Sequence, residues 1–232
     1  MAIEREKILD AALNLLNEVG LDQFTTRKLA LRLGVAQPAL YWHFRSKSTL
    51  LDALNEEMIA RYHTHPVPTH GEQWDEFTLA NARSIRRALL TVRDGARLNA
   101  GTRPTIRQFS DAEQWLRLYV DAGFTPQQAL GISIGIARYV VGFVLEEQGE
   151  RDRSDEETNE TGDAVEELAA FPLLSAAIEP LFQDGGTINT EGVFEAGLGY
   201  MLAGIRASLA GKRKPRRRRA VDVAGQKTKT AP

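Results

Sequence analysis

Apolar residues in this chain recur at intervals of three and four positions, and no segment shows the convincing alternation of a β-strand. Between Glu4 and Val19, one face of the expected helix carries Ile8, Ala12 and Leu16. Gly20 follows, where a helix C-terminus favours a residue without a side chain. Hydrophobic residues make up 43% of the 232 residues, which is enough to build a buried core. The sequence therefore predicts an all-α fold.

Two short helices separated by a glycine follow this first helix. Thr25 or Thr26 can cap the first of them with a hydroxyl, and Gly34 ends it. Pro38 favours the first turn of the next helix, because the N–H that proline lacks has no partner there in any helix. Two short helices joined by a glycine turn are typical of the helix-turn-helix layout.

A longer connecting helix, capped by Ser46, is predicted for residues 49–62 and completes an N-terminal domain of residues 1–62. The His65–Pro68 segment interrupts the helical pattern, so a second domain is placed at residues 63–211. Its expected helices cover residues 74–92, 94–99, 110–122, 126–147, 168–182 and 190–209. An acidic stretch at about residues 148–167 predicts a flexible linker, and residues 212–232 predict a disordered basic tail.

The charge of the chain is divided unevenly along its length. The formal net charge is -2, but residues 1–61 are neutral, residues 62–211 carry -10 and residues 212–232 carry +8. An acidic body is repelled by a nucleic acid duplex, so any contact with DNA is expected from the N-terminal domain, with the tail as a second candidate. A solubility role for the tail is the alternative.

Absent residue types and motifs exclude several classes of protein. The chain has no Cys, which excludes disulfide scaffolds and thiol catalysis. It has no P-loop, nucleophile elbow or zinc-protease motif, so we expect no enzymatic activity. We also expect no membrane contact and a cytoplasmic location, because no apolar run reaches the roughly 18 residues that span a bilayer.

Every charged side chain between residues 26 and 47 is basic, which gives the helix-turn-helix one face suited to phosphates. The N-terminal turn of a recognition helix meets base edges, and polar and aromatic groups cluster there in this sequence. The candidate DNA-binding residues are Thr26, Arg27, Gln37, Pro38, Ala39, Tyr41, Trp42, His43 and Lys47. The alternative is a solvated basic face with the aromatic side chains in the core, and Leu29, Leu33, Leu40 and Phe44 are assigned to the core.

The segment TTRKLALRLGVAQPALYWHFRSKSTLLDAL resembles the DNA-binding domain of the tetracycline repressor (TetR) family. The segments RRALLTVRDGARLNAGTRP, DAGFTPQQAL and VLEEQ resemble the ligand-binding core of its tetracycline-repressor subclass. The resemblance implies an all-helical homodimer that binds a palindromic operator and releases it when a small molecule enters the core. It points to the same DNA-binding residues, with Thr26 as a backbone contact and Ala39 where relatives often have Thr.

The resemblance also implies a set of inducer-binding residues. The positions that hold the ring system and magnesium in tetracycline-binding relatives are occupied here by His63, Asn81, Ile85, Asn99, Thr102, Pro104, Trp115 and Glu146. Asn99 replaces the His that binds the metal in those relatives, and a neutral amide is a poor substitute for imidazole on a divalent ion. Thr102 and Glu146 alone leave a weak magnesium site, so we expect no metal cofactor.

Three functions remain open from the sequence. The first is a repressor induced by a polycyclic, antibiotic-like or polyketide compound, with Trp115 as one wall of the ligand site. The second is a repressor of a resistance or efflux gene that is induced by magnesium–tetracycline. The third is a DNA-binding protein whose core binds a protein. For assembly, the resemblance implies a four-helix dimer interface from the helices at 126–147 and 190–209, although burial within one chain explains their pattern equally well.

Overall fold

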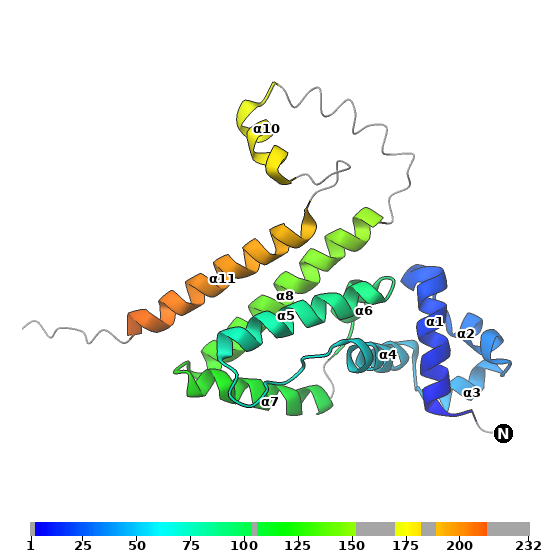
Figure 1. The fold of residues 1–232 in the computed structure, drawn as a ribbon. Helices are drawn as coiled ribbons and strands as arrows, with labels where there is room; N and C mark the ends of the chain where they lie inside the picture. The colour runs from blue at the N-terminus through cyan, green and yellow to red at the C-terminus, as the bar shows by residue number, and fades with distance from the viewer. Residues whose placement is uncertain (1–2, 104–105, 152–169, 182–188, 213–232) are drawn as a thin grey trace, which may run out of the picture.

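The computed structural model describes residues 3–103, 106–151, 170–181 and 189–212 (Figure 1). All regular elements in these ranges are helical, so the prediction of an all-α fold is confirmed. The elements are α1 (Arg5–Gln23), α2 (Thr26–Leu33), α3 (Gln37–Tyr41), α4 (Lys47–Tyr62), α5 (Trp74–Thr91), α6 (Gly95–Ala100), α7 (Ile106–Asp121), α8 (Pro126–Arg151), α10 (Pro172–Ile178), a 3-10 turn (Glu179–Leu181) and α11 (Thr190–Lys212).

The first three helices form the head of the molecule. Thr25 caps α2 by accepting a hydrogen bond from the backbone N–H of Lys28 at 3.1 Å. Gly34 ends α2 with a φ of 66°, a left-handed conformation that glycine adopts without strain. Gly20, with a φ of 71°, kinks the end of α1 where the sequence predicts a break, and the chain then makes one more turn to Gln23. The predicted helix-turn-helix is present.

Helix α4 leaves the head and enters the body of the molecule, α5–α8 and α11. Its N-terminus carries a capping box: the Ser46 hydroxyl accepts from the Thr49 N–H at 3.1 Å and the Thr49 hydroxyl accepts from the Ser46 N–H at 3.0 Å. The cap is the predicted one, although the helix begins at Lys47 rather than at residue 49. Leu54 and Met58 are fully buried, and α4 packs on α1, α5 and α6.

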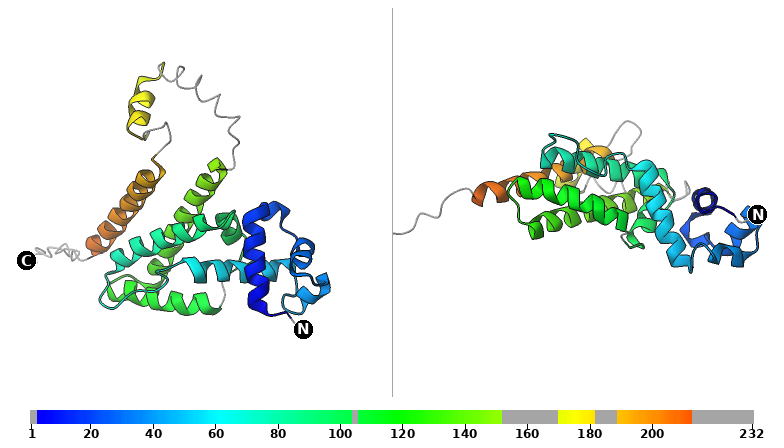
Figure 2. Two further views of the ribbon diagram at one scale, coloured as in Figure 1. Left: turned by 45° about the vertical axis from the view of Figure 1, so that its right-hand side comes forward. Right: turned by 90° about the horizontal axis from the view of Figure 1, so that it is seen from below.

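In the body, α5 and α8 pack side by side, while α7 and α11 lie against α8 (Figures 1 and 2). The views in Figure 2 place the head at one end and the C-terminal end of α11 at the other. Trp74, Tyr119 and Phe124 form an aromatic cluster with ring centroids 5.0 to 6.0 Å apart. This cluster fixes the far end of α7 and leaves the start of α7, nearer the head, to form a wall of a cavity.

The C-terminal half departs from the expected boundaries. Helix α8 continues to Arg151, so the predicted linker does not begin at residue 148, and α10 covers only Pro172–Ile178 of the helix expected at 168–182. Pro104, residues 152–167 of the linker and residues 213–232 of the tail lie outside the described residues. Helix α8 also has an 18-residue window with mean hydropathy 1.6, long and apolar enough to cross a membrane, so the expectation that no segment has this character is wrong. A core helix of a soluble protein meets the same criterion.

The head and the body meet where α1 ends. Asp94 precedes α6 with a φ of 57° and is buried. Its carboxylate accepts a hydrogen bond from the Leu21 N–H at 2.6 Å and from Arg97 at 3.1 Å. Arg97 in turn pairs with Asp22 of α1 at 2.7 Å, and the paired carboxylates raise the pKa of Arg97 above its usual range. Helix α6 is therefore bonded to the end of α1 and also packs against α4.

Candidate functional site: a helix-turn-helix surface and a cavity beneath it

The residues predicted to contact DNA gather on the outer side of α2, α3 and the start of α4. Arg27, Pro38, Tyr41, Trp42, His43 and Lys47 are exposed, and Thr26, Gln37 and Ala39 are half-buried. Gln37 donates a hydrogen bond to the Thr26 hydroxyl at 2.8 Å, which ties the start of α3 to the start of α2. Trp42 is 89% exposed, so it is available to a partner and is not part of the core. Leu29, Leu40 and Phe44 are buried as predicted, and Leu33 is half-buried.

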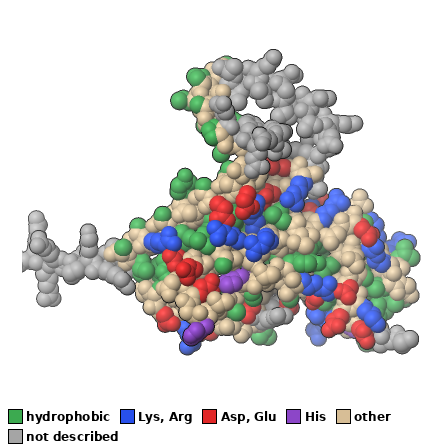
Figure 3. All heavy atoms as spheres, in the orientation of Figure 1, with side chains coloured by type: hydrophobic (Ala, Val, Ile, Leu, Met, Phe, Trp, Pro, Cys, Tyr) green, Lys and Arg blue, Asp and Glu red, His purple; other side chains and the backbone are tan. Residues whose placement is uncertain are grey.

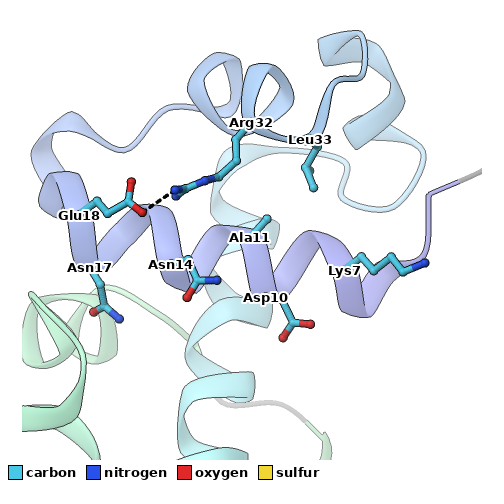
Figure 4. Close-up of a pocket in the computed structure, with 8 residues that line it drawn as sticks. All are labelled: Lys7, Asp10, Ala11, Asn14, Asn17, Glu18, Arg32 and Leu33. Atoms are coloured by element: carbon cyan, nitrogen blue, oxygen red, sulfur yellow. Dashed lines mark hydrogen bonds and ion pairs between the residues drawn. The ribbon is translucent and has the colours of Figure 1, made fainter.

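Arg32 departs from the basic face that the sequence predicts. It forms an ion pair with Glu18 of α1 and lines a polar groove between α1 and α2 (Figure 4). Figure 4 shows the Arg32 side chain directed along this groove toward Glu18. Figure 3 shows basic and acidic side chains mixed over the visible faces of both the head and the body. Arg32 therefore pairs with an acid of α1, and the other basic side chains between residues 26 and 47, all exposed, are Arg27, Lys28, Arg45 and Lys47.

Beneath the head, a cavity of about 490 Å³ opens between α4, α5, α7 and α8. Five of the predicted inducer-binding residues line it: His63, Asn81, Ile85, Asn99 and Trp115. Its remaining walls are mostly apolar and include Ile59, Phe77, Phe109, Ile136 and Val140. A cavity of this size with apolar walls and a few polar groups is typical of small-molecule sites.

The polar groups at one end of the cavity form a hydrogen-bonded chain. Nδ1 of His63 lies 2.9 Å from the hydroxyl of the fully buried Ser84, and the Asn81 amide nitrogen lies 3.2 Å from Nε2 of His63. The Asn81 amide also donates to the backbone carbonyl of His65 at 2.8 Å. Burial, together with the nearby charges of His65 and Arg87, lowers the pKa of His63 from 6.5 to about 4. His63 is therefore neutral at physiological pH.

Asn99 connects the cavity to α4. Its amide donates a hydrogen bond to the side-chain oxygen of Asn55 at 3.1 Å, and Asn55 is only 4% exposed. Thr102 does not line the cavity and donates its hydroxyl to the Asn99 carbonyl at 3.0 Å. Glu146 is exposed on α8 and does not line the cavity, whereas its neighbour Glu147 is buried and pairs with Arg86 at 2.7 Å.

The residues named for a weak magnesium site, Thr102 and Glu146, do not come together at the cavity in the described structure. The part of the chain that the structure describes contains no group of three or more His, Asp or Glu side chains that could hold a metal. Asn99, which does line the cavity, offers only a neutral amide oxygen. Magnesium prefers several oxygen ligands in octahedral geometry, and this set does not provide them within one chain.

The sequence reasoning missed several lining residues: Pro66, Phe77, Thr78, Gln108, Phe109, Asp111 and Tyr119. Thr78 and Tyr119 form a hydrogen bond through their hydroxyls, and burial raises the pKa of Tyr119. A signal was present for α7, because Asp111, Trp115 and Tyr119 lie four positions apart and so share one face of the helix. The residues on α5 and α8 have no comparable signal, since their exposure to the cavity depends on how the helices cross.

Comparisons with known proteins agree with this arrangement. The profile of bacterial regulatory proteins of the tetR family matches residues 8–54, and that of the tetracyclin repressor-like C-terminal domain matches residues 67–209. The chain is 48% identical over 203 residues to the class A tetracycline repressor protein from transposon 1721 of Escherichia coli, covering 88% of this chain and 90% of that one.

Two solved structures are also similar. A TetR variant from Acinetobacter baumannii in complex with minocycline is 41% identical, with a TM-score of 0.72 over 89% of this chain and 98% of that one. Class A TetR in complex with 5a,6-anhydrotetracycline and magnesium is 39% identical, with a TM-score of 0.68 over 88% of this chain and 99% of that one.

The helix-turn-helix head and the ligand-sized cavity define a DNA-binding regulator with a sensor body. The chain belongs to the TetR family of bacterial regulatory proteins, and its C-terminal part to the tetracycline repressor-like group.

Proposed function

We propose that this protein is a ligand-responsive transcriptional repressor that binds a palindromic operator as a homodimer, in the cytoplasm, and releases it when a polycyclic compound enters the cavity. The observation that carries the proposal is that α4 takes part in both sites. Lys47 begins this helix at the DNA-binding surface, while Ile59 and His63 at its other end line the cavity. A ligand that moves the cavity end of α4 also reorients the head.

The mechanism is a shift between two populations. One conformation holds the heads at the spacing of the operator, and the other holds a ligand. A ligand favours the second conformation by its difference in affinity for the two, and coupling energies of about 1 to 3 kcal/mol are typical of such systems. Ligand contact with Ile59 and His63 acts on α4 and its C-terminal end, and contact with Asn99 acts on α6, which the Asn99–Asn55 hydrogen bond joins to α4.

On the DNA side, we assign Arg27 and Gln37 to base edges, with Pro38, Ala39 and Tyr41 beside them. His43 and Lys47 are assigned to phosphates, Thr26 to a backbone contact and Trp42 to the sugar–phosphate surface. All nine lie in α2, α3, the turn after α3 and the first residue of α4, and the five that carry a charge or an aromatic ring, Arg27, Tyr41, Trp42, His43 and Lys47, are exposed. Arg27 has the geometry for a bidentate contact to guanine, while Lys47 contributes charge without sequence preference.

Homodimer formation through α8 and α11 is part of the proposal. Only 22% of the apolar window of α8 is buried within the chain. On α11, Tyr200 is exposed, and Gly199 and Gly204 have open space where a side chain would lie. Small residues beside exposed apolar ones allow a helix of a second copy to approach closely.

A second candidate is a repressor induced by a magnesium–tetracycline complex. It is favoured by the similarity to class A TetR, which was solved with 5a,6-anhydrotetracycline and magnesium. It is opposed by the described lining of the cavity, which includes neither Thr102 nor Glu146. A protein partner for the core, the third function open from the sequence, has less support, because the cavity is concave and of ligand size.

The test begins with an operator duplex selected by the protein from a random library and measures its affinity by fluorescence anisotropy over a range of salt concentrations. Lys47→Ala is expected to weaken binding and to reduce the slope of log affinity against log salt by about 1, as the loss of one phosphate contact does. Lys7→Ala, on the groove side of α1, is the matched control and should leave the slope unchanged.

The same duplex then distinguishes the candidates. Anhydrotetracycline and other polycyclic compounds are added with magnesium chloride or with EDTA. Release that persists in EDTA supports the first candidate, and release that requires magnesium supports the second. If the protein selects no duplex from the library, the proposed function is wrong.

A further inference from the structure

Asp111 is the one carboxylic acid side chain on the described walls of the cavity. His63 is neutral because its pKa is about 4, and Tyr119 keeps its proton because burial raises its pKa. Asp111 is half-buried, and no described residue donates a hydrogen bond or forms an ion pair with its carboxylate. A carboxylate in a largely apolar cavity is stabilised when a positive charge approaches it.

The aromatic side chains around Asp111 suit such a charge. Trp115 lies one helical turn further along α7 on the same face, and Phe109 and Tyr119 line the same cavity. The rings of Trp115 and Tyr119 meet edge to face with centroids 6.5 Å apart. Aromatic faces attract cations, and a carboxylate beside aromatic rings is the arrangement that recognises protonated amines attached to apolar groups.

The positive charge does not come from a metal bound by this chain. The described residues provide no cluster of three or more His, Asp or Glu side chains that could bind a metal. A ligand that carries its own positive charge would pair with the Asp111 carboxylate without a metal. The size and apolar walls of the cavity require the rest of that ligand to be a ring system.

We propose that the cavity takes a polycyclic ligand bearing a protonated amine, which the Asp111 carboxylate holds while Trp115 packs against the rings, without a divalent ion. This inference rests on the proposed function, because it names the class of ligand for the same cavity. It makes Asp111 the residue that determines specificity for charge. It also separates this chain from relatives whose ligand is bound together with magnesium.

The experiment uses the full-length protein without DNA and measures the affinity for two tricyclic probes by isothermal titration calorimetry. Proflavine is a cation at neutral pH, and acridine has the same ring skeleton without the charge. Both are titrated in EDTA and again in magnesium chloride. Asp111→Asn removes the charge with little change in shape. Asp121→Asn, at the exposed end of the same helix and outside the cavity, is the matched control.

We expect the wild-type protein to bind proflavine more tightly than acridine, to the same extent in EDTA and in magnesium. Asp111→Asn should weaken proflavine binding about tenfold or more, as loss of a charge-assisted hydrogen bond does, and leave acridine binding unchanged. Asp121→Asn should change neither. Three results would each overturn the inference. They are an affinity for each probe that Asp111→Asn does not change, binding that requires magnesium, and no binding of proflavine. Because DNA is absent, these outcomes are distinct from a failure to select an operator.

Discussion

At the scale of single residues, the buried polar groups around His63 depend most strongly on their hydrogen-bond partners. Ser84 is fully buried, and its hydroxyl accepts hydrogen bonds from the backbone N–H groups of Thr64 at 2.8 Å and His65 at 3.2 Å while it also contacts Nδ1 of His63. Buried polar groups remain stable only when they are paired, and a charged imidazole cannot be accommodated among these partners without rearrangement. His63 therefore contributes a pH dependence to the stability of the fold.

The free energy of unfolding should fall as the pH is lowered from about 6.5 to about 4. The unfolded chain binds a proton at His63 below pH 6.5, whereas the folded chain resists it until the pH reaches about 4, so acid favours the unfolded state. At 1.36 kcal/mol per pH unit, the loss reaches about 3 kcal/mol. Urea titrations of the wild-type protein and His63→Gln across this range measure it. Between pH 6.5 and pH 4, the free energy of unfolding of His63→Gln should fall by about 3 kcal/mol less than that of the wild-type protein. An equal fall in the two proteins would contradict the prediction.

At the scale of elements, the Asn55–Asn99 hydrogen bond joins α4 to α6 beside the cavity. Asn55 is buried in α4 among apolar residues that include Leu54 and Met58. Its side-chain oxygen has the Asn99 amide as a partner in the adjacent helix. Because the two amides are hydrogen-bonded to each other, substitutions of Asn55 and Asn99 should not have additive effects on the free energy of unfolding.

Asn55→Leu or Asn99→Leu alone is expected to reduce the free energy of unfolding by about 1 to 3 kcal/mol, since each leaves one amide without its partner. The double variant should be less destabilised than the sum of the two, because both unpaired groups are then removed together. Chemical denaturation of the four proteins completes the cycle. Additive losses would show that the two side chains act independently and that α4 and α6 are coupled elsewhere.

At the scale of the whole molecule, the two sites lie at the head and in the body, and α4 connects them (Figures 1 and 2). The junction is reinforced by Asp94, which holds the end of α1 from the start of α6. Away from the head, α8 and α11 leave apolar surface uncovered in one chain. A second copy that covers this surface also places two heads on one palindrome.

Tyr200→Glu should convert the proposed dimer to a monomer in analytical ultracentrifugation, because it places a charge on a side chain that is 79% exposed in one chain and that we assign to the interface. Operator affinity should fall with it, since each monomer then binds only one half-site. Leu31→Glu, at a site on α2 that is 81% exposed, is the control and should sediment as the wild-type protein does. A dimeric Tyr200→Glu protein would place the interface elsewhere.

The sequence alone determined the helical elements of the head and most of its caps. Thr25, Gly34 and Ser46 act on backbone groups within a few residues of themselves, so their roles can be predicted from local spacing. The resemblance to a known family supplied His63, Asn81, Ile85, Asn99 and Trp115, which the structure brings to one cavity.

Tertiary structure decided the pairings between distant segments. Arg32 belongs to an ion pair with Glu18, Asn99 has Asn55 as its partner, and Asp111 faces a cavity rather than solvent alone. The sequence distinguishes neither Glu146 from Glu147 nor a cavity wall from a packed core. Local hydrogen bonding and apolar periodicity fix where a helix begins, ends and turns its apolar face, whereas the partner of a side chain on another helix depends on the angle and register at which the two helices cross.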